Sequence, residues 1–219
     1  MDEGHTEADR TEPSHAPMPG AESLAEPLRS RWSPSIFDDT HRLGPEDVET
    51  LLHAAQWAPS WGNSQPWAFV VAERGSPSHD LLVPHLSRGN AGWVPRASVV
   101  FVTAVQVAPD PAGEGGASPG HAFHDLGQAA AHLTLQARSM GLHAHQFAGF
   151  DREAVHAALG VPVWFEVMTG IAVGVRGNPE DVPERDRGRE QKVRRRRELS
   201  EFVWGPSWGE PWGAPGRAE

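Results

Sequence analysis

An apolar run near the middle of the chain constrains the fold more than any other feature. Residues 98–105 read Ser-Val-Val-Phe-Val-Thr-Ala-Val and are rich in β-branched side chains. A strand of this composition is typical of a sheet that is covered on both faces. Residues 67–72 and 166–175 also have strand character. In the second of these, alternation predicts that one face carries Val167, Thr169, Ile171, Val173 and Val175.

Three segments with helical spacing can cover such a sheet. The first follows Pro45, a residue favoured at the first helical position, and ends before Pro59. The longest is expected over residues 121–140, and Asp151 is expected to cap a third that runs to about residue 159. Weaker helical patterns cover residues 24–31, interrupted by Pro27, and 76–86. This order of helices and strands predicts an α+β, three-layer sandwich rather than a βαβ ladder.

The 121–140 helix has two kinds of small or apolar positions. Its apolar stripe, expected to face the core, is Leu126, Ala129, Ala130, Leu133 and Ala137. Its small residues would permit close approach by another helix, and they are Gly127, Ala129, Ala130 and Ala131.

The ends and one internal stretch differ in composition from the rest of the 219-residue chain. Residues 1–23 are rich in Glu, Asp, Pro, His and Ser, so we expect a disordered acidic tail before a single domain over 24–213. Residues 107–120 are rich in Pro, Gly and Ala and predict a mobile loop. At the other end, we expect a strand over 199–204 within a C-terminal arm, 199–213, that contains three tryptophans.

Composition also excludes several kinds of function. The chain has no cysteine, which rules out disulfides, zinc-thiolate sites, iron–sulfur clusters and thiol nucleophiles. It has no signal-like apolar segment and no apolar run of the ~18 residues that a membrane helix needs, so a cytoplasmic protein without a membrane partner is expected. The net charge of −10 argues against general nucleic-acid binding. Phosphate-loop, nucleophile-elbow, zinc-protease and dinucleotide-fingerprint motifs are all missing from the sequence.

Residues 59–67, Pro-Ser-Trp-Gly-Asn-Ser-Gln-Pro-Trp, form the most distinctive loop. The carboxamides of Asn63 and Gln65 can donate and accept hydrogen bonds together, which suits the edge of a planar heteroaromatic ligand. A plain helix-to-strand connector has the same composition.

Two further groups of residues have more than one interpretation. The arginines at 194–197 suit a solvated face, a nucleic-acid patch or an anion site. The histidines around residues 121–145 suit a metal site or ordinary surface and core positions, and we expect no metal.

Five segments in order resemble the nitroreductase family of FMN-dependent oxidoreductases, over about residues 28–212. Residues 31–37 look like the opening R-x-S-x-[RK]-x-F segment, and 59–67 look like the P-S-x-x-N-x-Q-P-W loop. Asn90 resembles a flavin-contacting asparagine of some members, and 147–151 look like the G-F-D turn after the long helix. The arginine run followed by residues 198–204 looks like the C-terminal phosphate-contacting segment.

The resemblance implies a nitroreductase-like three-layer sandwich, with a mainly antiparallel sheet flanked by helices, in an intertwined homodimer whose subunits share each flavin site. It implies FMN as cofactor, with arginines and Ser33 on the phosphate, amides on the ring edge and the Gly149 N–H facing flavin N5. No protein acid or base is required, so no catalytic residue is assigned. The expected FMN-binding residues are Arg31, Trp32, Ser33, Ser35, Pro59, Ser60, Trp61, Asn63, Gln65, Asn90, Ala148, Gly149, Arg194, Arg196 and Arg197.

The activity implied is transfer of hydride from NAD(P)H through flavin N5 to a nitroaromatic, a quinone or another small oxidised acceptor. Two alternatives stay open: a flavin dehydrogenase or oxidase acting on a specialised metabolite, and a non-catalytic FMN-binding protein. The chain departs from the family pattern at four positions, where Ser35 replaces a basic residue, Ala148 a glutamate, Trp93 a lysine and Trp61 a small residue. These departures concern the acceptor and the donor more than the flavin.

Overall fold

The computed structural model describes residues 18–115 and 119–213, and its centre is a four-stranded sheet. The strand order is β1-β2-β4-β3, and every pair is antiparallel. The strands are β1 (Trp67–Glu73), β2 (Val99–Gln106), β3 (His143–Phe147) and β4 (Phe165–Gly174). β2 lies between β1 and β4 and is buried along almost its whole length, as its apolar run predicts.

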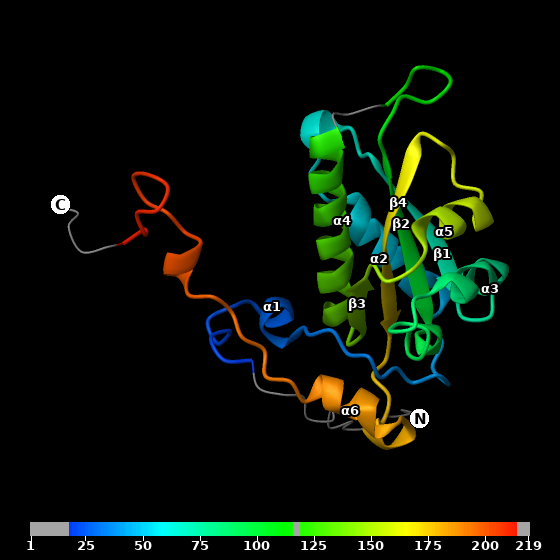
Figure 1. Ribbon diagram of the computed structural model, residues 1–219, viewed down its shortest axis with the longest axis horizontal. Helices are drawn as coiled ribbons and strands as arrows, with labels where there is room; N and C mark the ends of the chain where they lie inside the picture. Colours follow the sequence, from blue (N-terminus) through cyan, green and yellow to red (C-terminus); the bar gives the residue numbers. More distant parts are fainter. Residues whose placement is uncertain (1–17, 116–118, 214–219) are drawn as a thin grey trace, which may run out of the picture.

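Helices cover both faces of this sheet (Figure 1). On one face α2 (Pro45–Gln56) and α4 (Pro119–Ser139) pack against Val99, Phe101 and Ile171. On the other, α3 (Pro77–Leu82) and α5 (Arg152–Ala158) pack against Val100, Val102 and Ala172. The two sets of β2 residues alternate, because successive side chains of a strand point to opposite faces. The predicted α+β sandwich with a mainly antiparallel sheet is therefore confirmed.

A β-bulge changes one expectation about β4. The register between β2 and β4 shifts between Thr103 and Ala104, so Val167 packs with the α3 and α5 side of the sheet. Ile171 and Val173 pack on the α2 and α4 side, with Val175 against them. The prediction that Val167 shares their face is wrong, because one extra residue in a strand reverses the side-chain pattern beyond it.

Hydrogen bonds between residues close in the chain fix where α2 and α5 begin. The Asp47 carboxylate accepts from the Gly44 N–H at 3.0 Å at the start of α2. The predicted cap at Asp151 is confirmed, since its Oδ1 accepts from the Ala154 N–H at 3.0 Å. α4 begins at Pro119, so the last two residues of the predicted 107–120 loop are helical, and residues 116–118 of that loop lie outside the described residues. The apolar stripe predicted for α4 is buried throughout.

Near the two ends of the chain, the structure differs from several of the sequence predictions. A short helix, α1 (Glu26–Ser30), contains Pro27 in its first turn, where proline is tolerated, instead of being broken by it. The strand expected at 199–204 is wrong: Leu199–Glu201 forms a 3₁₀ turn, and a single bridge pairs Trp204 with Pro211. Among the residues that the structure describes, no strand extends this bridge into a ladder. Of the predicted acidic tail, residues 1–17 lie outside the described residues.

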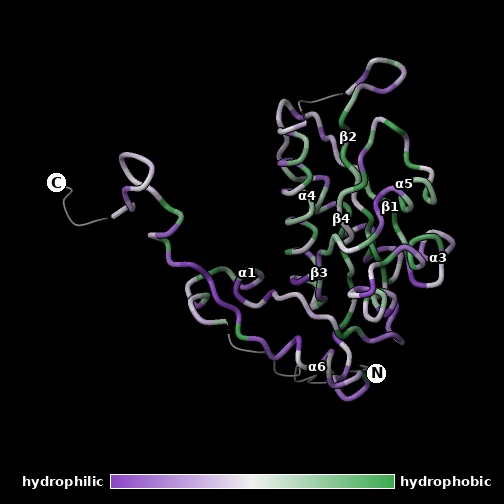
Figure 2. The backbone as a smooth tube through the Cα atoms, in the orientation of Figure 1, coloured by the Kyte–Doolittle hydropathy of each residue, from purple (hydrophilic) through white to green (hydrophobic). Residues whose placement is uncertain are grey.

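Two elements have no counterpart in the expectations. β3 is only five residues long and pairs with β4 at the edge of the sheet, and α6 (Glu184–Glu190) precedes the arginine run. From α6 onward the chain runs away from the domain as a mainly hydrophilic tube (Figures 1 and 2). Trp208 and Trp212 on this arm are exposed. Within residues 18–115 and 119–213, no helix is both long and apolar enough to cross a bilayer.

Candidate cofactor site

A cavity of about 390 Å³ opens beside the C-terminal half of α4. Thr134 and Leu135 of α4 line one side, and His145 and Gln146 of β3 line another. The segment that leads from α1 toward the sheet completes it with Arg31 and Ser33. Its size lies in the range of roughly 300–1,000 Å³ that small-molecule sites occupy.

A second cavity, of about 250 Å³, meets the first at Arg31. Arg29, Arg194 and Arg196 line it together with residues 18–21 and two leucines. The structure thus brings three predicted phosphate ligands together: Arg31, Arg194 and Arg196. Arg197 lies elsewhere, with its guanidinium 5.2 Å from the centre of the Phe202 ring.

Arg31, Arg194 and Arg196 lie close together although their positive charges repel one another. Burial, and then the neighbouring Arg196, lower the pKa of Arg31, and burial is also the main cause that lowers the pKa of Arg194. The buried Nε of Arg31 and Nη1 of Arg194 have no hydrogen-bond acceptor among the described residues. Buried N–H groups of this kind are costly unless an acceptor reaches them, and a phosphate is such an acceptor.

Trp32 is buried beneath this cluster rather than lining a cavity. Only 1% of the residue is exposed, and the guanidinium carbons of Arg176 and Arg194 each lie 4.7 Å from the centre of its ring. Ser35 is also buried, and its N–H donates to Glu190 at 2.7 Å. Both residues, predicted to bind the cofactor, are placed by the structure where they support the arginines.

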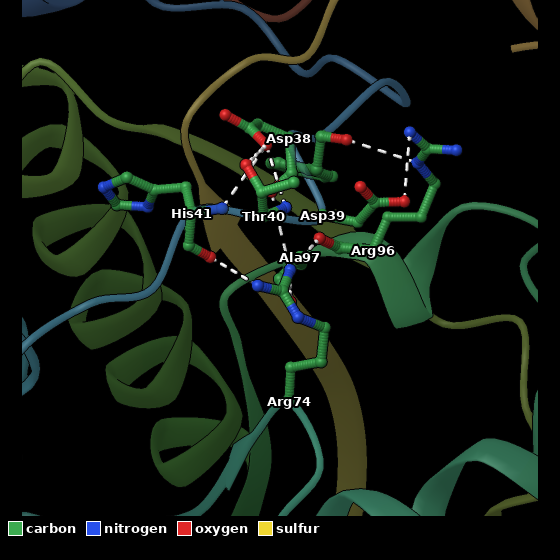
Figure 3. Close-up of polar contacts among 8 residues, drawn as sticks. Asp38, Asp39, Thr40, His41, Arg74, Arg96 and Ala97 are labelled. Atoms are coloured by element: carbon green, nitrogen blue, oxygen red, sulfur yellow. Dashed lines mark hydrogen bonds and ion pairs between the residues drawn. The ribbon is translucent and has the colours of Figure 1, made fainter. Parts of the chain in front are cut away.

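Arg74 and Arg96 fix the position of residues 37–41, which follow Ser35 in the chain (Figure 3). Arg74, at the end of β1, donates to the carbonyls of His41 and, at 2.7 Å, Arg96. Arg96 donates to the Phe37 carbonyl at 3.2 Å and forms an ion pair with Asp39 at 3.3 Å. The chain from Phe37 to His41 is therefore tied to the end of the sheet, which fixes the preceding segment that carries Arg31 and Ser33.

His145 and Gln146 belong to the cavity but were not predicted as site residues. The His145 Nδ1–H donates to the Pro34 carbonyl at 2.8 Å, and its ring stacks on Trp93 at 4.3 Å. Burial lowers the pKa of His145, so the neutral ring is favoured. The Gln146 amide donates to Thr134 at 2.9 Å. If residues 143–147 had been recognised as a strand that follows the long helix, His145 and Gln146 would have been expected to lie beside that helix.

A hydrogen bond connects Asn90 to Gly149. The Asn90 amide donates to the Gly149 carbonyl at 3.0 Å, and its Oδ1 accepts from the Trp93 indole at 3.1 Å. A Cβ on Gly149 would lie 2.5 Å from the Asn90 amide nitrogen and 2.6 Å from Ser87 Oγ. A larger residue here would therefore displace the Asn90 and Ser87 side chains from their present positions. Ala148, beside it, is exposed.

The 59–65 loop has an unusual backbone. Gly62, Asn63 and Gln65 all have positive φ, at 57°, 57° and 47°. Left-handed conformations are uncommon for residues other than glycine and tend to occur at functional sites. The Ser60 hydroxyl stabilises the turn by accepting from the Gln65 N–H at 3.1 Å. The side chains of Asn63 and Gln65 are exposed.

α4 also fixes the position of this loop. The buried Asp125 carboxylate accepts from the Trp61 N–H at 2.9 Å, and Gln128 donates to the Pro59 carbonyl at 3.3 Å. The Trp61 ring stacks on His121 at 5.1 Å. The loop is thus attached to the first half of α4, whereas the cavity lies along its second half. Within one chain the structure does not place Asn63 and Gln65 in the cavity that Arg31 lines.

Known proteins share this architecture. The family model described as the Nitroreductase family matches residues 28–88 and 75–175. A candidate NADH dehydrogenase/NAD(P)H nitroreductase from Archaeoglobus fulgidus is 28% identical over 165 residues, covering 73% of this chain and 88% of that protein. The 5,6-dimethylbenzimidazole synthase of Rhodospirillum rubrum is 30% identical over 179 residues, covering 67% of this chain and 80% of the synthase.

A solved structure described as an oxidoreductase containing FMN is 33% identical. It superimposes with a TM-score of 0.77 and covers 86% of this chain and 95% of its own. The chain belongs to the nitroreductase family. The family expected from the sequence is thereby confirmed.

Proposed function

We propose that this protein is an FMN-dependent oxidoreductase that takes hydride from NAD(P)H and delivers it to a small oxidised acceptor. The observation that carries the proposal is a pair of buried, acceptor-free guanidinium N–H groups, on Arg31, which lines both cavities, and on Arg194, which lines the 250 Å³ cavity. A phosphate dianion there would satisfy both groups and offset the mutual repulsion of the arginines.

The remaining residues fit the rest of FMN. Arg31, Ser33, Arg194 and Arg196 would hold the phosphate, and Gln146 and His145 would flank the cavity beyond it. Gly149, which packs closely against the Asn90 and Ser87 side chains, would present its N–H to the ring. When bound, FMN supplies the redox chemistry by accepting and releasing hydride at N5, so the protein's tasks are binding, orientation and exclusion of water.

A second copy of the chain would complete the site. The 59–65 loop is attached near Asp125 and the cavity lies near Thr134, so each is offset from the other along α4. Two-fold pairing of antiparallel α4 helices would place the loop of one protomer over the cavity of its partner. Gly127 and Ala131 are exposed on α4 and small enough for such contact, whereas Ala129 and Ala130 are used in the chain's own core. The exposed tryptophans of the C-terminal arm suit the same interface.

The absorbance spectrum of the purified protein tests the proposal. A flavin spectrum that bleaches anaerobically with NADPH or NADH, and returns on addition of a quinone or nitroaromatic, is the expected result. Protein that is colourless and does not retain added FMN would contradict it.

Salt dependence separates the predicted roles of two residues. Arg31→Ala should raise the FMN dissociation constant by roughly 10- to 150-fold and flatten its salt dependence, because a charge-assisted bond of roughly 1.5–3 kcal/mol is removed. Asn63→Ala should weaken binding with the wild-type salt slope retained, since that contact is to a neutral ring edge. Fluorescence titration of FMN at several salt concentrations measures both, and equal slopes for the two variants would refute the assignment.

A second candidate function is an oxidase or dehydrogenase that acts on a specialised metabolite. The 30% identity to 5,6-dimethylbenzimidazole synthase favours it over a purely binding role. Oxygen uptake that requires a metabolite, with no dependence on an added quinone or nitroaromatic, would support this candidate instead.

A further inference from the structure

Glu190 is a buried carboxylate in the middle of an arginine cluster. It ends α6, and 3% of the residue is exposed. Its Oε1 accepts from the Ser35 N–H at 2.7 Å and the Ile36 N–H at 2.9 Å, and its Oε2 accepts from Arg176 at 2.9 Å. Three partners from two distant parts of the chain therefore converge on one side chain, which joins the C-terminal segment to the segment that carries Arg31.

Arg176 connects Glu190 to the cavity. The guanidinium of Arg176 is buried, with 4% of its side chain exposed, and it lies over the same Trp32 ring as Arg194. Among the charged groups that act on Arg194, Glu190 attracts it, while Arg31, Arg196 and Arg176 repel it. Glu190 is thus the group that opposes the like charges around Arg194.

We infer that Glu190 is a positioning residue for the phosphate end of the cofactor, and that it sets the preference for phosphorylated over unphosphorylated flavin. Without its charge, Arg176 would lose the 2.9 Å ion pair to Glu190, and the repulsion between Arg176 and Arg194 over their shared ring would be opposed less. Loss of a buried ion pair is destabilising, so the cluster would separate to relieve the repulsion. The Ser35–Ile36 backbone, held by the same carboxylate, would loosen with it. The inference rests on the proposed function, because it assumes that the arginines bind the FMN phosphate.

Glu190→Gln tests the charge, since glutamine retains an acceptor for the Ser35 and Ile36 N–H groups. The matched control is Glu180→Gln, the same substitution at an exposed position ten residues earlier. Fluorescence titrations measure the dissociation constants of FMN and of riboflavin, which lacks the phosphate. Glu190→Gln should weaken FMN about tenfold and change riboflavin less than twofold, and Glu180→Gln should change neither.

The Arg176→Gln/Glu190→Gln double variant tests the cause. It removes both charges of the buried pair, so it should recover part of the FMN affinity lost in Glu190→Gln. If Glu190→Gln is not folded, Glu190→Asp takes its place, because the shorter carboxylate cannot reach all three partners. Glu190→Asp should likewise weaken FMN more than riboflavin.

Three outcomes would overturn the inference: FMN affinity unchanged or increased in the Glu190 variant, FMN and riboflavin weakened equally, or no recovery in the double variant. The first would show that the carboxylate does not assist phosphate binding, and the second that it acts on the fold as a whole. Failure of the wild-type protein to bind either flavin would instead refute the proposed function.

Discussion

At the scale of single residues, the candidate site contains N–H groups without hydrogen-bond acceptors and residues with strained backbone conformations. Arg31 and Arg194 keep N–H groups free of acceptors within the described residues, and Asn63 and Gln65 keep left-handed backbones. Both conditions cost stability in the protein alone and can be recovered when a ligand binds. The groups that support the arginines, Trp32, Ser35 and Glu190, are all buried.

His145 should make the protein sensitive to mild acid. Burial lowers its pKa in the folded state, whereas the unfolded chain has the ordinary value of about 6.5. The unfolded state therefore takes up a proton first, and stability is lost as pH falls below about 6.5 toward the folded-state pKa.

His145→Phe should reduce the dependence of the free energy of unfolding on pH between pH 7 and 5, by up to about 1.4 kcal/mol per pH unit. Urea denaturation at several pH values measures this dependence. The loss of the Pro34 hydrogen bond lowers stability at every pH and leaves the slope unaffected. A variant with the wild-type slope would contradict the assignment; His79, whose pKa burial also lowers, remains in both proteins.

At the scale of elements, the bulge between β2 and β4 decides which side chains face which helices. Thr103 and Thr169 pair next to it, and the Thr103 hydroxyl accepts from the Thr169 N–H at 3.1 Å and contacts the Thr169 hydroxyl at 2.9 Å. Thr103 is fully buried, so this pair adds buried side-chain hydrogen bonds beside the bulge.

Thr103→Val should lower the free energy of unfolding by about 1–3 kcal/mol, because it leaves the partly buried Thr169 N–H without this acceptor at nearly unchanged volume. Thermal or urea denaturation measures the change. Thr50→Val is the matched control: Thr50 is exposed on α2, so the same substitution should change stability by less than about 0.5 kcal/mol. Equal effects at the two positions would show that the bulge does not depend on the threonine pair.

At the scale of the whole molecule, the domain holds one part of the proposed flavin site at each end of α4. The cavity and the arginines lie at the end near α1, and the 59–65 loop lies at the other end (Figure 1). The outer side of α4 carries Gly127, around which a Cβ would meet nothing within 4 Å. This side is available to a second copy.

Gly127→Glu should therefore abolish dimer formation and FMN retention while leaving the single chain folded. Glutamate favours a helix over glycine by roughly 0.5–1 kcal/mol, so the fold itself should not suffer. Light scattering after size-exclusion chromatography measures the mass, and absorbance measures bound flavin. Ala157→Glu, at an exposed position of α5 on the opposite face of the sheet, should leave both unchanged. A Gly127→Glu dimer that still holds FMN would contradict the proposed interface.

Sequence reasoning named several of the residues that the structure brings together. Arg31 and Ser33 line the cavity, Arg194 and Arg196 converge on Arg31, and Gly149 packs closely against Asn90 and Ser87. It missed Gln146 and His145, because a five-residue edge strand with two histidines has no apolar pattern of its own. It also missed Glu190, since no local pattern distinguishes a buried carboxylate from the exposed charges around it.

The sequence by itself determined the alternation of elements, the central buried strand and the family. These depend on periodicity and on residues adjacent in the chain, such as Pro45, Asp151 and the 59–67 loop. Only the tertiary structure decided the β2–β4 register, the attachment of the loop to Asp125 and the convergence of Arg31, Glu190 and Arg194. Each of these joins segments separated by tens of residues or more, and such contacts are selected by the packing and charge balance of the whole domain.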